Sequence, residues 1–197
     1  RTPLNAIIGF SSLLHYVENE QEREQYISLI NHNNQLLLKL INDVLDLSKI
    51  EAGHIELHSE WFNPAELIEE SITEYERNVP AGVKLFARYP AAPGQIEHDP
   101  MRIKQILNNF ISNALKNTVQ GHIEVYYETD TDGIRISVSD TGCGIPPDKL
   151  GMIFERFEKV DSFAQGAGLG LSICKSIVEK MNGVITVDST MGVGSTF

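Results

Sequence analysis

Two asparagines and a lysine recur at helical spacing in the segment 100–116. Asn109 and Asn113 are four residues apart and Lys116 follows three residues later, so a helix would carry all three on one face. Asparagine is a poor helix former, and a pair of them in a helix interior therefore invites a chemical explanation. Their amide oxygens suit a hard cation such as Mg²⁺, and the lysine adds a positive charge that attracts anions. The alternative is a polar helix face in water.

A second candidate site follows the alternating segment 134–139, which predicts a strand with one apolar face. The strand delivers Asp140 into a turn that contains Gly142, Gly144 and Ile145. The glycines have no Cβ, so a flat ligand can lie against the backbone. A buried carboxylate needs a hydrogen-bond donor, and the amino group of an adenine is one candidate. An Asp-Thr-Gly turn is weak by itself, because aspartic proteases contain the same three residues.

A glycine-rich segment leads into a helix predicted over 168–181. Its residues are Gly166, Ala167, Gly168, Leu169, Gly170 and Leu171. Glycines before a helix N-terminus bring backbone N–H groups and the positive end of the helix dipole to an anion. The alternative is a flexible turn, but the preceding segment 158–165 has the character of a mobile lid over a site. Gly192, Gly194 and Ser195 form either a similar close-approach turn or a plain hairpin.

The elements that would position these residues form two groups. Apolar residues at helical spacing predict helices over 4–14 and 21–50, and Gly53 ends the second helix. Both helices are too apolar to cover each other in a monomer, so we expect a helical hairpin that dimerises into a four-helix bundle. Asn33, at a position facing the seam, either sets the register of this bundle or is simply solvated.

Beyond residue 53 the periodicity changes, and we expect an α+β sandwich with helices on one face of a sheet. Strands are predicted over 54–61, 83–89, 122–128, 134–139 and 184–188. Helices are predicted over 63–78, 100–116, 147–157 and 168–181. Phe154 and Phe157 are predicted core residues, with stacking on a ligand as the alternative. The expected domains are therefore 1–53, the hairpin, and 54–197, the sandwich.

The chain has 197 residues and a formal net charge of -11. This charge argues against nucleic acid or an anionic membrane as a partner, so a phosphate site must be a local feature. Cys143 and Cys174 are predicted to be reduced thiols of a cytoplasmic protein. The sequence has no apolar run long enough to cross a membrane and no signal peptide. It begins and ends in mid-pattern, so we expect a fragment, and anchoring of the parent protein in the inner membrane stays open.

Taken together, the motifs resemble those of the sensor histidine kinases of two-component systems. Residues 109–116 look like the N box of that family, 140–146 like the first glycine box and 154–157 like the F box. Residues 166–171 resemble the second glycine box, 191–197 the last one, and 1–5 the end of the histidine box. Order and spacing agree over essentially the whole chain.

The resemblance implies an ATP-binding domain of the Bergerat type, in which Asp140 binds the adenine amino group. Asn109 and Asn113 would bind Mg²⁺ and the phosphates, with Asn113 as the closer metal ligand. The residues implied in nucleotide binding are Asn109, Asn113, Lys116, Asp140, Gly142, Gly144, Ile145, Gly166, Gly168, Leu169, Gly170, Leu171 and Thr196. Members transfer the γ-phosphoryl group of ATP to a histidine on the hairpin of the homodimer, and then to an aspartate in the receiver domain of a response regulator. Thr2 matches a threonine that helps some members hydrolyse the phosphorylated regulator.

Three departures qualify the resemblance. The phosphoacceptor histidine is expected just upstream of Arg1, and none of the six histidines in the sequence lies in the right motif. Asn117 replaces a usual aromatic residue, and Lys159 replaces an arginine that many members have. Gyrase- and chaperone-type ATPases are a weaker alternative, because they carry a glutamate at the place of Asn109. The other alternative is a degenerate module that binds nucleotide and dimerises without phosphotransfer.

Overall fold

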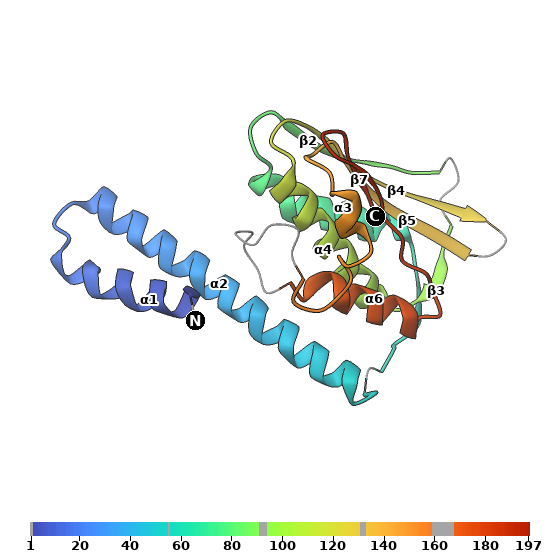
Figure 1. The fold of residues 1–197 in the computed structure, drawn as a ribbon, viewed down its shortest axis with the longest axis horizontal. Helices are drawn as coiled ribbons and strands as arrows, with labels where there is room; N and C mark the ends of the chain where they lie inside the picture. The colour runs from blue at the N-terminus through green and yellow to red at the C-terminus, as the bar shows by residue number, and fades with distance from the viewer. Residues whose placement is uncertain (1, 55, 91–93, 131–132, 159–167) are drawn as a thin grey trace.

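A computed structural model describes residues 2–54, 56–90, 94–130, 133–158 and 168–197 of the protein. Figure 1 shows a long helical hairpin that projects from an α/β body, with the second hairpin helix running back along that body. The hairpin consists of α1 (Thr2–Leu13), the short 3₁₀ turn η1 (Leu14–Tyr16) and α2 (Glu20–Glu51). The two helices predicted from apolar spacing are therefore confirmed.

Local signals set the limits of α2. The side chain of Asn19 caps its start by accepting a hydrogen bond of 2.9 Å from the backbone N–H of Gln21. Gly53 follows the last turn with φ of +70°, a left-handed conformation that glycine adopts without strain. Asn33 donates its side-chain N–H to the carbonyl of Leu29 at 2.7 Å, so within this chain its amide serves its own helix.

The body contains a five-stranded sheet in the order β2-β4-β5-β7-β6, with β2 (Val83–Arg88) parallel to β4 (Gly121–Asp130). The other neighbours are antiparallel: β4 with β5 (Gly133–Asp140), β5 with β7 (Gly194–Thr196), and β7 with β6 (Asp188–Thr190). A separate two-stranded sheet pairs β1 (Glu60–Phe62) with β3 (Ile96–His98).

Three helices lie against one face of the large sheet: α3 (Pro64–Tyr75), α4 (Pro100–Asn117) and α6 (Gly170–Lys180) (Figure 1). The main core forms where they meet the strands, and its members are Leu67, Ile68, Ile72, Val83, Ile103, Leu107, Phe110, Ile111, Ala114, Ile123, Val125, Tyr127, Val138 and Cys174. This is the α+β arrangement that the pattern predicts.

Asp99 positions the start of α4. Its Oδ1 accepts the backbone N–H of Arg102 at 3.0 Å, and Pro100 follows in the first helical turn. Its Oδ2 accepts the backbone N–H of His58 at 2.9 Å, so the same buried carboxylate also fastens the segment that leaves the hairpin. The N-cap residue of α4 thus has a second, tertiary role.

Several element boundaries differ from the sequence prediction. The strand expected over 54–61 pairs only over Glu60–Phe62, opposite β3, which the sequence did not predict. The helix expected over 147–157 is a single turn, α5 (Pro147–Leu150), because Gly151 ends it. The strand expected over 184–188 is displaced to Asp188–Thr190, since only those residues face a partner, β7, within the described chain.

Phe157 was predicted to be a core residue, and this is wrong. Its side chain is 68% exposed and its φ is +64°. Phe154, in contrast, packs edge-on against Phe197, whose ring stacks on Phe110. The turn that follows α5 therefore directs only one of the two aromatic rings inward.

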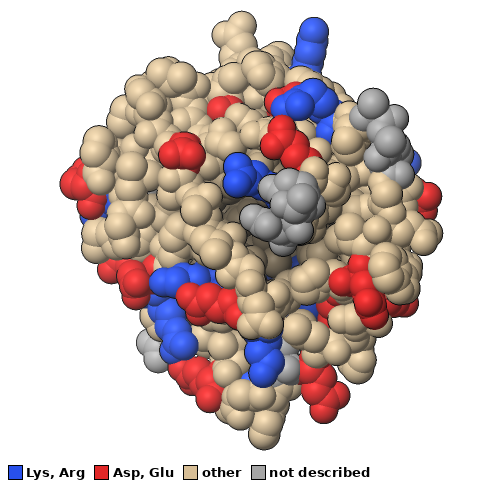
Figure 2. Space-filling model, turned by 90° about the vertical axis from the view of Figure 1, so that its right-hand side faces the viewer, with Lys and Arg blue, Asp and Glu red and all other residues tan. Residues whose placement is uncertain are grey.

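Charged side chains of both signs are spread over the body. On the face shown in Figure 2, Lys and Arg lie among Asp and Glu around a hollow near the centre. No helix in the described part of the chain is long and apolar enough to cross a membrane.

The C-terminal half of α2 packs against the body. Leu47 and Ile50 lie against Leu169, Ile173 and Ile177 at the start and inner face of α6. Polar contacts surround this apolar patch. Gln105 donates to Asp46 at 2.7 Å, Arg102 pairs with Asp46 at 3.8 Å, and Arg156 pairs with Glu51. The hairpin is thus docked on α4 and α6.

Candidate functional site

The asparagine pair of α4 lies as the spacing predicts. Asn113 donates its Nδ2 to Oδ1 of Asn109 at 3.0 Å, and both side chains are half-buried. The opposite face of α4 is buried in the core through Ile103, Leu107, Phe110 and Ala114. This packing fixes the rotation of the helix about its own axis. The polar pair is therefore held by packing behind it.

Lys116 extends this polar face by one turn. Partial shielding from water lowers the pKa of its ammonium group, and the nearby positive charge of Lys39 lowers it further, while Asp43 acts in the opposite direction. Two of these three charges belong to α2. The docked hairpin thus changes the electrostatic surroundings of the α4 face.

The start of α6 meets Asn109 directly. A Cβ added at Gly170 would lie 2.2 Å from Nδ2 of Asn109, so a larger residue at this position would force the Asn109 side chain to move. Gly168, two residues earlier, has φ of +70° and would place a Cβ 2.7 Å from the carbonyl of Glu158. The glycine-rich segment and the asparagine pair, far apart in sequence, therefore form one site.

Asp140 lies at the end of β5, where 8% of its surface is exposed. Burial raises the pKa of its carboxyl group, and hydrogen bonds from the backbone N–H groups of Gly142 and Ser195 lower it in part. The bond from Gly142 to Oδ1 is 2.8 Å long. The carboxylate is thus kept at the edge of the core with two backbone donors and remaining acceptor capacity.

The turn after Asp140 depends on close backbone approaches. A Cβ at Gly142 would lie 2.4 Å from the carbonyl oxygen of Asn117, and one at Gly144, with φ of +70°, would lie 2.2 Å from that of Thr190. Gly194, with φ of +138°, would place a Cβ 1.9 Å from the carbonyl oxygen of Asp140. The segment 192–195 therefore connects two antiparallel strands as a hairpin and also brings its backbone close to that of Asp140.

Asn117, which departs from the family pattern, lies against this turn. Its carbonyl oxygen accepts the backbone N–H of Cys143 at 3.2 Å, and its side chain donates to the carbonyl of Asn113 at 2.8 Å. It thus joins the end of α4 to the turn that follows Asp140.

Other predicted site residues have packing or hydrogen-bonding contacts. Leu169 is 1% exposed against α2, Leu171 packs on the main core, and Ile145 is buried with its N–H donated to Ser189 Oγ at 2.8 Å. Thr196 shares a 2.9 Å hydroxyl contact with Ser139 across β5 and β7. Ser189 was missed by sequence reasoning, because a serine in a short edge strand carries no motif signal.

One predicted residue lies away from this site, and two others lie outside the described residues. Thr2 begins α1 and is exposed, and it does not line the pocket beside Asn109. Gly166 and Lys159 lie outside the described residues. The site that the structure brings together therefore consists of the α4 face, the Asp140 turn and the start of α6.

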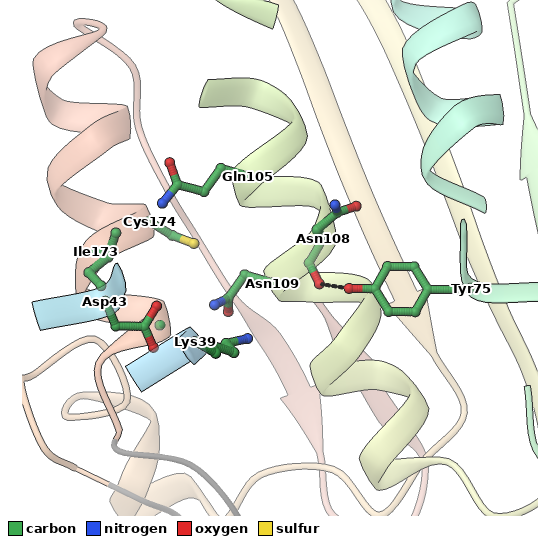
Figure 3. Close-up of a pocket in the computed structure, with 9 residues that line it drawn as sticks. Lys39, Asp43, Tyr75, Gln105, Asn108, Asn109, Ile173 and Cys174 are labelled. Carbon is green, nitrogen blue, oxygen red and sulfur yellow. Dashed lines mark hydrogen bonds between the residues drawn. The ribbon is translucent and has the colours of Figure 1, made fainter. Parts of the chain in front are cut away.

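A pocket of about 200 Å³ opens beside Asn109, between α2, α3, α4 and α6. Figure 3 shows Lys39 and Asp43 of α2 facing Asn109, with Ile173 and Cys174 of α6 above Asp43 in this view. Burial raises the pKa of Cys174 to about 12, so this thiol stays protonated. Sequence reasoning did not anticipate Lys39 or Asp43, because they belong to the hairpin and to no nucleotide-binding motif.

The α4 face offers oxygen ligands for a metal ion. Among the described residues no three His, Cys, Asp or Glu side chains gather into a metal site. The amide oxygen of Asn113 is available, because its nitrogen makes the bond to Asn109. A neutral amide oxygen suits Mg²⁺ that also binds phosphates, so this donor set fits a nucleotide-bound ion.

Comparison with known proteins identifies both parts of the chain. The family model "Histidine kinase-, DNA gyrase B-, and HSP90-like ATPase" matches residues 98–197, just over half of the chain. The model "His Kinase A (phospho-acceptor) domain" matches residues 1–53. The resemblance inferred from the motifs is confirmed.

Sensor histidine kinase RcsC of Salmonella typhimurium is 38% identical over all of this chain, which spans 21% of that relative. A structure of full-length ShkA in complex with AMPPNP is 32% identical, with a TM-score of 0.80 over all of this chain and 42% of ShkA. The histidine kinase ThkA in complex with the response regulator protein TrrA is 26% identical, with a TM-score of 0.71 over 99% of this chain and 56% of ThkA. The chain thus belongs to the histidine kinase-, gyrase B- and HSP90-like ATPase family, and within it to the sensor histidine kinases.

Proposed function

We propose that the chain is the dimerisation and catalytic core of a kinase that binds Mg-ATP and transfers the γ-phosphoryl group to a histidine on the hairpin. The contact between Asn109 and Gly170 carries this proposal, because it joins the metal-binding face of α4 to the glycine-rich start of α6. Residues 1–53 would serve dimerisation and phosphotransfer, and residues 54–197 nucleotide binding.

Each element of the site has a distinct task in this proposal. Asp140 accepts a hydrogen bond from the adenine amino group, and the glycines of its turn leave room for the ring. Asn113, with Asn109, holds Mg²⁺, and Lys116 adds positive charge beside the phosphates. When bound, Mg²⁺ neutralises charge on the phosphate oxygens. The N–H groups at the start of α6 bind phosphate oxygens, so the protein contributes mainly positioning and electrostatic stabilisation.

The hairpin would serve as the homodimer interface, and the receiver domain of a response regulator as the acceptor of the relayed phosphoryl group. The ThkA structure, solved with a response regulator protein, supports this partner by similarity. Thr2, near the start of α1, is the candidate for assisting hydrolysis of the phosphorylated regulator. We assign the core to the cytoplasm, where ATP is available.

The proposal is tested with a chain extended upstream through its expected histidine box, in Mg²⁺ and γ-labelled ATP. We expect an acid-labile, base-stable label that is lost when Asn113 is replaced by Ala. Nucleotide binding without label would instead favour a regulatory module that binds nucleotide and dimerises. Absence of nucleotide binding would overturn the assigned site itself.

A further inference from the structure

We propose that Lys39, carried by the hairpin helix α2, is a ligand for the terminal phosphate of the bound nucleotide. The phosphate site is then shared between the hairpin and the body. This inference rests on the proposed function and adds to it a residue outside the nucleotide-binding motifs. Its geometric basis is the pocket beside Asn109, which Lys39 and Asp43 line together with Gly170 (Figure 3).

The position of Lys39 is fixed by the docking of α2. Asp43, Asp46 and Ile50 follow Lys39 at intervals of four, three and four residues, so all four lie on the face of α2 that meets the body. Ile50 packs on α6, and Asp46 accepts the side-chain N–H of Gln105 at 2.7 Å. These contacts, one and two turns beyond the pocket, hold Lys39 at its mouth.

The charges around the pocket favour an anion. Burial and the nearby carboxylate of Asp46 raise the pKa of Asp43, while Lys39 and Lys116 lower it, so these charges lie within electrostatic range of Asp43. Because Asp46 pairs with Arg102, the two lysines face the single remaining carboxylate of Asp43, which leaves a net positive charge at the pocket. The side chain of Lys39 is exposed and can follow a phosphate group, while Asp43 is half-buried.

The start of α6 supplies a second reason to expect phosphate here. Gly170 lies in this pocket and touches Asn109, and the N-terminus of an eleven-residue helix directs N–H groups to the same place. A terminal phosphate held there would face Lys39. Asp140, which would bind the adenine, does not line this pocket, so we expect Lys39 to contact the terminal phosphate and not the base.

The test compares Mg²⁺-bound AMPPNP with ADP, because only AMPPNP has a third phosphate group. Isothermal titration on the whole chain would measure both affinities for Lys39→Met, Asp43→Asn and Lys49→Met. Lys49, exposed in the last turn of the same helix, is the matched control for the loss of one positive charge. All three changes keep the side chain close in size.

We expect Lys39→Met to weaken AMPPNP binding by about three- to tenfold and to leave ADP binding unchanged, because it removes one charge-assisted contact. Asp43→Asn should strengthen AMPPNP binding, since it removes a negative charge from the pocket, and Lys49→Met should change neither affinity. The proposal is overturned if Lys39→Met weakens both nucleotides equally or neither. If the wild-type chain binds neither nucleotide, the proposed function itself fails.

Discussion

At the scale of single residues, the site depends on positions where one atom more would not fit. At four glycines, a Cβ atom would lie 2.4 Å or less from a backbone or side-chain atom of another residue. These glycines are Gly142, Gly144, Gly170 and Gly194. Such contacts bring the Asp140 turn, the end of α4 and the start of α6 together. The chemistry of Asp140 and of the asparagine pair then follows from what surrounds them.

Replacing Asp140 with Asn should weaken nucleotide binding while it keeps a hydrogen bond that stabilises the turn. An amide can still accept the bond from Gly142, but it cannot provide the same charged acceptor for an adenine amino group, so we expect nucleotide affinity to fall by about ten- to hundredfold. Isothermal titration with ADP would measure this. A variant that binds ADP as tightly as the wild type would contradict the assignment of Asp140 to the base.

The stability of the same variant has a predictable pH dependence. Burial raises the pKa of Asp140, so its contribution to folding is complete below the ordinary aspartate pKa and is lost as the pH rises through the raised value. The amide of the variant does not ionise, so it has no such loss. Urea unfolding from mildly acidic to neutral pH should therefore show the Asp140→Asn variant gaining stability relative to the wild type. A constant difference would contradict this sign.

Replacing Gly170 with Ala tests the junction of α4 and α6. The added Cβ would lie 2.2 Å from Asn109 Nδ2 and would displace the asparagine pair. We expect a loss of about 1–3 kcal/mol in the free energy of unfolding and weaker nucleotide binding. Gly151→Ala is the control, because nothing lies within 4 Å of its added Cβ. Equal effects of the two changes in urea unfolding and titration would argue against a specific contact.

At the scale of elements, long periodic segments were predictable and short ones were not. Helices α1, α2 and α4 follow from apolar spacing and from the caps at Asn19 and Asp99. Strands β1 and β3 have only three residues each, and they pair next to a tertiary bond from His58 to Asp99 that no local pattern encodes. For the same reason the motifs predicted most of the site but not the approach of α2 to it.

The docking of α2 on the body depends in part on the contacts of Asp46. Its pairing with Arg102 is 3.8 Å, and both side chains are 23% exposed, so we expect a coupling of about 0.5–1 kcal/mol in a double-mutant cycle of Asp46→Ala and Arg102→Ala. Amide hydrogen exchange in α6 would measure it, because undocking uncovers that helix.

The control for this cycle is the pair Arg23–Glu20, which lies in the first turn of α2 with side chains 45% and 76% exposed. Its removal should leave exchange in α6 unchanged. If the two single variants at Asp46 and Arg102 add without coupling, the contact does not contribute to docking, and the apolar patch of Leu47 and Ile50 is sufficient.

At the scale of the whole molecule, α2 has two apolar faces with different roles. Leu47 and Ile50 face the body, whereas other apolar side chains of the hairpin remain uncovered in the single chain. The largest of these exposed residues are Leu4, Ile8, Leu13, Tyr16, Ile27, Leu29, Leu38, Ile41, Val44 and Leu45. An apolar surface of this extent along a helix pair indicates a partner, and a second hairpin in a four-helix bundle fits it.

The central part of that surface should decide the oligomeric state. Leu38 and Leu45 are 60% and 53% exposed and lie two turns apart on α2, so a second hairpin would bury them at the centre of the bundle. We expect Leu38→Glu with Leu45→Glu to raise the dimer dissociation constant by at least about thirtyfold, and sedimentation velocity to detect monomer. His32→Glu is the charge control and should stay dimeric, because His32 is exposed and lies seven residues before Lys39, on a different face of α2 from Leu38 and Leu45.

Nucleotide binding distinguishes dissociation from unfolding in this experiment. Neither leucine lines the pocket beside Asn109 or packs in the described core, so a monomeric variant should bind ADP with the affinity of the wild type. Since the phosphoryl acceptor is expected on the hairpin, transfer can then be compared between dimer and monomer at equal nucleotide occupancy. A double variant that remains dimeric would mean that the bundle forms through the other exposed residues of α1 and α2, and the arrangement of its helices would have to be revised.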